Sequence, residues 1–225
     1  MKLEPISKSE AARYMGISGD LDPQIQKILD KAEETARNEL IPKYVYRESA
    51  LEFRTDGVYI SGMSSPLTGK DIVNHLRGCT RAVLLAATLT ASADKLIRQA
   101  RIEGMAEALA MDCICSAAIE QVCDRAETEI FYYVNAPFRT WRFSPGYGDL
   151  PITAQSDILK FLNAHRRIGL TVTPESLLIP SKSVTAIIGI SDSRLMKNPR
   201  GCSVCSIRDT CAFTGKGGCG KNNSV

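Results

Sequence analysis

Apolar residues at helical spacing predict two helices at the start of the chain. Residues 7–10, Ser-Lys-Ser-Glu, form a capping box, in which a serine hydroxyl and a later glutamate satisfy N–H groups at a helix start. Gly16 can end the short helix that follows. Asp22 and Pro23 mark a second start, because aspartate caps a helix and proline is tolerated at the first helical position. From there to Pro42, apolar residues recur every three or four positions.

Alternating and continuous apolar runs predict strands and further helices in the middle of the chain. Residues 51–60 alternate around an Asp-Gly turn signal at 56–57, which is the pattern of a hairpin. A short helix is expected over residues 68–78. The all-apolar run 82–87 then predicts a buried strand. Residues 91–133 carry a long helical pattern, which we expect to break near Gly104 into two helices.

The rest of the chain mixes short strands with one helix. The pattern predicts a helix over residues 154–162, a tight turn over 144–149, and strands over 140–143, 168–173 and 183–190. Several neighbouring strands have the spacing of antiparallel pairs. The sequence therefore predicts an α+β fold, with a twisted, mainly antiparallel sheet, flanking helices and an irregular cysteine-rich C-terminal tail.

Three segments follow from these patterns. Residues 1–68 are expected to form a helical and hairpin segment packed on the body of the protein. Residues 69–194 form the core, and residues 195–225 form the cysteine-rich tail, which lacks the periodicity needed to bury a core of its own.

Composition excludes several classes of protein. The chain has 225 residues, 44% of them hydrophobic and 24% charged, which is typical of a globular protein and not of a disordered or fibrous one. A net charge of +3 is too small for a dedicated nucleic-acid binder. No apolar stretch is long enough to span a bilayer, and the N-terminus has no secretory pattern. We therefore expect a cytoplasmic protein that binds neither nucleic acid nor membrane.

The eight cysteines divide into two groups. Cys79, Cys113, Cys115 and Cys123 lie in apolar segments and are expected to be small buried hydrophobes. The other group crowds near the C-terminus among glycines and basic residues, which favour thiolates, and in a reducing compartment this predicts a metal centre. Its ligands would be Cys202, Cys205, Cys211 and Cys219. The spacing leaves both zinc and an iron–sulfur cluster open, and a need for electron delivery would favour the cluster.

A second candidate site surrounds Arg142. A guanidinium there can bind a carboxylate or phosphate through two hydrogen bonds, and Gly146 and Gly148 allow the backbone of the following turn to approach a ligand. Free N–H groups are expected in that turn. In the long helical segment, Asp112 and Glu120 lie on one face with small and apolar residues, so each is either partnered or functional, or lies half-exposed at the edge of that face.

Residues 142–151, Arg-Phe-Ser-Pro-Gly-Tyr-Gly-Asp-Leu-Pro, match a known motif, R-x-x-P-G-Y-x-x-x-P. Thr173, Pro180, Ser183 and Val184 match a second one, T-x(6)-P-x-x-S-V. On these residues the chain resembles the activation domain of cobalamin-dependent methionine synthase. The resemblance is specific over residues 136–191 and looser over 69–135, and residues 1–68 look like those of the short stand-alone form.

The resemblance implies a ligand, S-adenosylmethionine, and residues that bind it. Arg142 would hold the ligand's carboxylate, and the turn would contribute Ser144, Pro145, Gly146 and Tyr147. Glu120, or as second choice Asp112, would meet the ammonium group.

The resemblance also implies partners and a role. The family supports the reductive remethylation of cob(II)alamin, with an electron from a flavodoxin-like or ferredoxin-like reductant. This chain lacks the D-x-H-x-x-G motif of cobalamin-binding domains, so the cobalamin would be supplied by a partner, methionine synthase or a related corrinoid protein. No general base or nucleophile is required, and His75 and His165 are expected at the surface or at helix ends, with no catalytic role.

Three functions remain open at this point. The leading one is a stand-alone reactivation protein within a methyltransferase system. The second is a non-catalytic module that binds S-adenosylmethionine or a corrinoid protein. The third is an electron-transfer protein that uses the cysteine-rich tail.

Overall fold

The computed structural model describes residues 2–17, 19–195 and 209, and the chain forms two compact units. Unit 1 takes the chain up to Val45, together with Ala86–Val134 and Asn163–Val184. Unit 2 takes Tyr46–Leu85, Asn135–Leu162 and the described chain from Thr185 onward. The boundaries expected after residues 68 and 194 stay a prediction.

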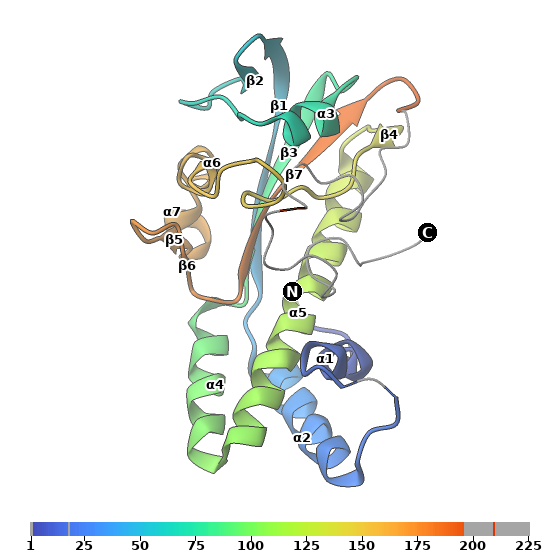
Figure 1. Ribbon diagram of the computed structural model, residues 1–225, viewed down its shortest axis with the longest axis vertical. Coiled ribbons are helices and arrows are strands. Elements are labelled where there is room, and N and C mark those ends of the chain that lie inside the picture. The colour runs from blue at the N-terminus through green and yellow to red at the C-terminus, as the bar shows by residue number, and fades with distance from the viewer. Residues whose placement is uncertain (1, 18, 196–208, 210–225) are drawn as a thin grey trace. The chain divides into compact units, whose positions relative to one another are not determined.

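Unit 1 is mainly helical. Its helices are α1 (Lys8–Tyr14), α2 (Pro23–Glu39), α4 (Thr90–Glu103), α5 (Met105–Tyr133) and α7 (Ala164–Ile168) (Figure 1). The helix starts predicted at both N-terminal caps are confirmed, since the Ser7 hydroxyl accepts from Glu10 N and the Asp22 carboxylate accepts from Gln24 N. The break near Gly104 is confirmed as well, because α4 ends one residue before it and α5 begins one residue after it.

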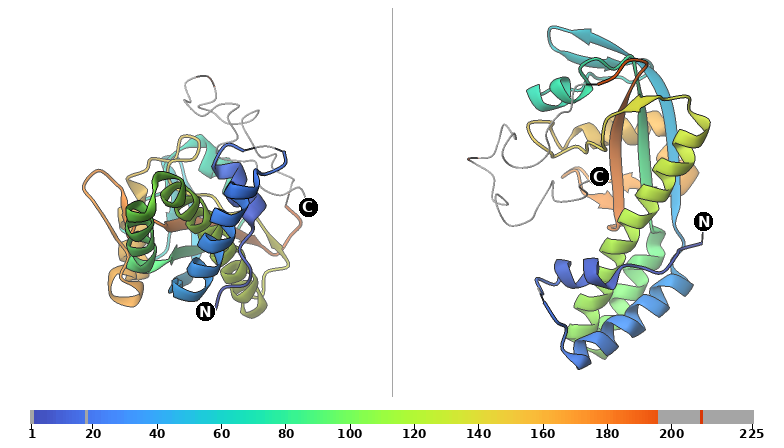
Figure 2. Two further views of the ribbon diagram at one scale, coloured as in Figure 1. Left: turned by 90° about the horizontal axis from the view of Figure 1, so that it is seen from below. Right: turned by 90° about the vertical axis from the view of Figure 1, so that its right-hand side faces the viewer.

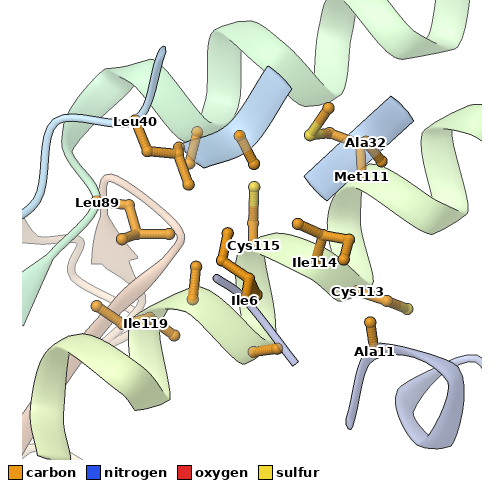
Figure 3. Close-up of a cluster of buried hydrophobic side chains, with 14 of the residues drawn as sticks. Ile6, Ala11, Ala32, Leu40, Leu89, Met111, Cys113, Ile114, Cys115 and Ile119 are labelled. Carbon is orange, nitrogen blue, oxygen red and sulfur yellow. The ribbon is translucent and has the colours of Figure 1, made fainter. Parts of the chain in front are cut away.

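Helix α5 is the centre of the unit 1 core. Helices α1, α2 and α4 each pack against it, and the views in Figure 2 show α1 and α2 lying beside it. Ile114 and Cys115 of α5 are fully buried and lie among apolar side chains from the other helices (Figure 3). Burial of Cys79, Cys113, Cys115 and Cys123, expected from their apolar surroundings, is confirmed.

A short hairpin completes unit 1, and one strand there is shorter than predicted. Strands β5 (Thr171–Val172) and β6 (Leu178–Ile179) pair antiparallel, whereas a strand was expected from residue 168 to 173. Ile168 instead ends α7. Gly169 takes the left-handed conformation, φ +72°, and donates its N–H back to His165 O, which is how a glycine ends a helix.

Unit 2 is built on a five-stranded sheet of order β2-β1-β3-β7-β4. Its strands are β1 (Lys43–Arg54), β2 (Gly57–Ile60), β3 (Arg81–Thr88), β4 (Phe138–Arg139) and β7 (Ser183–Ser191), and some end residues of β1, β3 and β7 belong to unit 1. β1 with β2 and β4 with β7 pair antiparallel, and the α+β class with a mainly antiparallel sheet is confirmed. The hairpin turn is Thr55-Asp56, one residue earlier than predicted, because Gly57 pairs with Arg54.

Two helices, α3 (Lys70–Leu76) and α6 (Ala154–Leu162), belong to unit 2. The bounds of α6 are those predicted. The buried strand predicted over residues 82–87 is confirmed within β3, where every one of these side chains is inaccessible to solvent. No helix in the described part of the chain is long and apolar enough to cross a membrane. The cysteine-rich tail lies outside the described residues, apart from its first residue and Asp209.

Candidate functional site

The segment that carries Arg142 is fastened to β7 in unit 2. Thr140 N donates to Gly189 O at 2.9 Å, and Phe143 exchanges two backbone hydrogen bonds with Ile187. The strand predicted over residues 140–143 is wrong in extent, because regular pairing covers only Phe138–Arg139. At the first anchor Gly189 N also donates to the Thr140 hydroxyl at 2.8 Å, so a side chain takes the place that a backbone carbonyl has in a regular ladder. Arg142 lies half-buried directly before the second anchor.

The turn after Arg142 is held by its own backbone. Tyr147 N donates to Ser144 O, Leu150 N donates to Tyr147 O, and Gly146 N donates to Leu150 O at 2.9 Å. These three N–H groups are therefore engaged within the turn, and free N–H groups at its other positions stay a prediction. Pro145 is buried, while Gly146 is exposed and Tyr147 is 38% exposed. The predicted turn itself is confirmed.

Asp149, which the sequence analysis did not single out, connects this turn to helix α3. Its two carboxylate oxygens accept from Lys70 N at 2.7 Å and from Asp71 N at 2.9 Å. Residue 69, the position that would cap α3 locally, is a glycine and makes no side-chain capping bond. Helix α3 was predicted, but its cap lies far along the chain and no local pattern indicates it.

Four aromatic rings line the same part of unit 2. His75, in the last turn of α3, lies 4.5 Å from the ring of Trp141 and 4.9 Å from that of Phe143, measured between centroids. Phe143 in turn lies 6.2 Å from Tyr147. His75 lies at a helix end, one of the two places expected for it, and is only 3% exposed. The single tryptophan of the protein thus lies within the group of residues that carries the motif.

The two carboxylates proposed from the helical pattern share one face of α5 in unit 1. Within residues 111–120, only Asp112, Ser116 and Glu120 are not buried, and their spacing of four places them along a single stripe. Lys182 Nζ lies 3.0 Å from the Asp112 carboxylate and 2.8 Å from the Ser116 hydroxyl. The Lys182 side chain is 15% exposed. Asp112 therefore already has a cationic partner, and Glu120 lies one helical turn beyond Ser116.

Three of the four cysteine thiols in the described chain are unsuited to nucleophilic chemistry. Burial raises the pKa of Cys79 to about 11 and that of Cys115 to about 12, and it raises the pKa of Cys113 as well. These groups stay protonated at neutral pH. Among the described residues no three histidine, cysteine or acidic side chains are grouped so as to hold a metal ion. Cys202, Cys205, Cys211 and Cys219 lie outside those residues.

Comparison with known proteins gives a match in structure. No protein-family model matches the chain, and no curated protein matches it in sequence. Among solved structures, it is similar to the crystal structure of the MetH reactivation domain bound to AdoHcy, with a TM-score of 0.65. The match covers 87% of this chain and 77% of that domain, at 15% sequence identity. This chain has the reactivation-domain fold.

The reactivation-domain fold confirms the fold that the resemblance of residues 142–151 implied. At 15% identity the match establishes the fold alone, and the ligand belongs to the matched domain. The roles assigned to Arg142, Ser144, Pro145, Gly146, Tyr147, Glu120 and Asp112 stay predictions. The structure places the first five on one anchored segment of unit 2 and the two acids on one face of α5 in unit 1.

Proposed function

We propose that this protein binds S-adenosylmethionine and supports the reductive remethylation of cob(II)alamin on a partner corrinoid methyltransferase, methionine synthase. The observation that carries the proposal is the reactivation-domain fold over 87% of the chain, in a match whose solved structure holds AdoHcy. AdoHcy is what S-adenosylmethionine becomes when it gives up its methyl group. The R-x-x-P-G-Y motif points to the same ligand through its resemblance to the methionine synthase activation domain, and it lies on a segment fastened to β7.

The residue types fit this ligand. S-adenosylmethionine is a sulfonium with a zwitterionic amino-acid end, so its site needs a cation for the carboxylate and an acid for the ammonium group. We assign Arg142 to the carboxylate, the turn residues Ser144, Pro145, Gly146 and Tyr147 to further contacts, and Glu120 to the ammonium group. The partner's cobalamin supplies the chemistry, with an electron from a flavodoxin-like or ferredoxin-like reductant, and this chain supplies binding and orientation. We expect the protein to act in the cytoplasm.

The resemblance makes Glu120 the first choice for the ammonium group and Asp112, whose carboxylate lies 3.0 Å from Lys182 Nζ, the second. Replacement of Glu120 by glutamine (Glu120→Gln) should therefore weaken the binding of S-adenosylmethionine by roughly tenfold, since a hydrogen bond to a charged group contributes about 1.5–3 kcal/mol. The same substitution should weaken the binding of a desamino analogue, which lacks the ammonium group, much less. Asp112→Asn is the matched control on the same face of α5 and should leave both affinities nearly unchanged. Equal losses of affinity for the two ligands in calorimetry would show that Glu120 does not bind the ammonium group.

A reconstituted reaction separates reactivation from simple binding. The partner protein, carrying cob(II)alamin, is mixed under anaerobic conditions with this protein, a chemical reductant and S-adenosylmethionine labelled in its methyl group. We expect label on the partner's cobalamin and an equal amount of AdoHcy. Tight binding of S-adenosylmethionine with no methyl transfer would favour the alternative of a non-catalytic binding module.

We further propose that the cysteine-rich tail, residues 195–225, binds one metal centre through Cys202, Cys205, Cys211 and Cys219. The support is sequence alone, since four thiols in 18 residues among glycines can surround a single metal. Metal analysis of anaerobically purified protein should find iron or zinc, and replacing the four cysteines by serine should remove it. A brown protein with visible absorption would indicate an iron–sulfur cluster and favour a role in electron transfer. Protein with neither metal would disprove this assignment.

A further inference from the structure

We propose that Asp149 is a positioning residue, whose carboxylate fastens the turn of residues 144–150 to the start of helix α3 and so sets the affinity for S-adenosylmethionine. The proposal rests on the function proposed above. Asp149 occupies a variable position of the R-x-x-P-G-Y-x-x-x-P motif, so the motif itself gives it no role. Its importance follows from contacts within unit 2.

The Asp149 carboxylate caps helix α3 from a distant part of the chain. The first N–H groups of any helix have no partner inside the helix and need an acceptor. In α3 the N–H groups of Lys70 and Asp71 donate to the two carboxylate oxygens of Asp149, at 2.7 and 2.9 Å. Asp149 lies 79 and 78 positions further along the chain than these two residues. The negative charge is also favourable at a helix N-terminus. One side chain therefore stabilises α3 and ties the turn to it.

Two glycines allow this close approach. A Cβ at position 69 would lie 2.5 Å from Asp149 Oδ1 and 2.9 Å from its carbonyl oxygen. A Cβ at position 148 would collide with the carboxylate of Asp71, and Gly148 also has the left-handed φ of +52° that disfavours other residues. Side chains at either position would force the turn and the helix apart.

The other end of α3 contacts the residues that lead into the turn. The His75 ring packs against Trp141 and Phe143, which flank Arg142 in the sequence. Helix α3 therefore contacts this segment at two places: at Asp149, after the residues assigned to the ligand, and at Trp141 and Phe143, on either side of Arg142. Because the turn closes through its own hydrogen bonds and Gly146 and Tyr147 at its tip are exposed, the placement of the tip depends on how firmly both sides are held.

Loss of the Asp149 carboxylate should weaken ligand binding more than a general loss of stability does. Asp149→Ala should raise the Kd for S-adenosylmethionine about tenfold in calorimetry, and Asp149→Asn, which keeps one acceptor oxygen, should fall between it and the wild type. The matched control is Asp22→Ala, which removes the cap of α2 in unit 1. It should destabilise the protein to a similar degree and leave the Kd unchanged. Gly148→Ala keeps the Asp149 carboxylate but disturbs the contact between the turn and helix α3, and it should also raise the Kd.

A second set of measurements tests whether the turn and helix α3 are held together in the absence of ligand. Amide hydrogen exchange in peptides covering residues 70–76 and 144–150 should become faster in Asp149→Ala and remain unchanged in Asp22→Ala. The emission of Trp141, the only tryptophan, should shift in the first variant and not in the second.

The outcomes separate this proposal from the function on which it rests. Wild-type protein that binds no S-adenosylmethionine in calorimetry would overturn both. Wild-type affinity in Asp149→Ala, with faster exchange, would make Asp149 a helix cap alone and leave the proposed function standing. Where Asp149→Ala does not fold, Asp149→Asn and Gly148→Ala decide: wild-type affinity in both would overturn the positioning role.

Discussion

Replacement of Arg142 by alanine should weaken the binding of S-adenosylmethionine by one to two orders of magnitude. A hydrogen-bonded contact between a guanidinium and a carboxylate contributes roughly 1.5–3 kcal/mol, which corresponds to this change in Kd. The backbone at this position is held by β7 through Thr140 and Phe143 on either side, so the substitution should leave the turn in place. Calorimetry on the folded variant measures the effect directly.

Two further variants test the assignment of Arg142 to the ligand's carboxylate. Arg142→Lys should recover only part of the affinity, because an ammonium group cannot present two parallel donors. Arg167→Ala removes an equal charge from an exposed position of α7 in unit 1 and should leave the Kd unchanged. Wild-type affinity in folded Arg142→Ala would assign the carboxylate to another group.

The elements that could be predicted from the sequence are those whose determinants lie within a few residues. Ser7 and Asp22 cap the helices that directly follow them, and the run of apolar residues within β3 needs only burial on both faces to form a central strand. The R-x-x-P-G-Y motif is equally local, because its turn closes on itself through hydrogen bonds between residues 144 and 150. For that reason the turn at the candidate site could be predicted before the structure was known.

The features that could not be predicted depend on residues far apart in the chain. The cap of α3 comes from Asp149, and the interruption of the strand at Thr140 depends on a hydroxyl that meets Gly189 of β7. The burial of His75 depends on the rings of Trp141 and Phe143, of which its sequence neighbours give no sign. Position 69 gives no sign of the distant cap of α3, because glycine is itself common at the N-cap of a helix.

The pairing of Asp112 with Lys182 is a further contact of this kind, and it changes the chemical interpretation of a residue. On sequence alone Asp112 and Glu120 are equivalent acids on one face of α5. The β6–β7 connection brings Lys182 against Asp112 and Ser116, so the two carboxylates differ in their surroundings. A ligand ammonium would have to compete with Lys182 at Asp112.

The largest loss of stability is expected from a cavity in the core around α5. Ile114 is fully buried among side chains of the unit 1 helices (Figure 3), and Ile114→Ala removes buried methyl and methylene groups. Substitutions of this type cost about 2–5 kcal/mol, because the lost transfer free energy adds to that of the cavity left behind. Urea unfolding followed by circular dichroism should show a lower midpoint with an unchanged slope.

The same substitution at an exposed position supplies the control. Ile102 of α4 is 88% exposed, so Ile102→Ala removes the same atoms without opening a cavity. Its effect should stay within about 0.5 kcal/mol, as for most surface substitutions. Both variants replace isoleucine by alanine within a helix. The difference between their free energies of unfolding therefore reports the effect of burial and not that of helix propensity. Equal destabilisation by the two would mean that α5 does not form the centre of the unit 1 core.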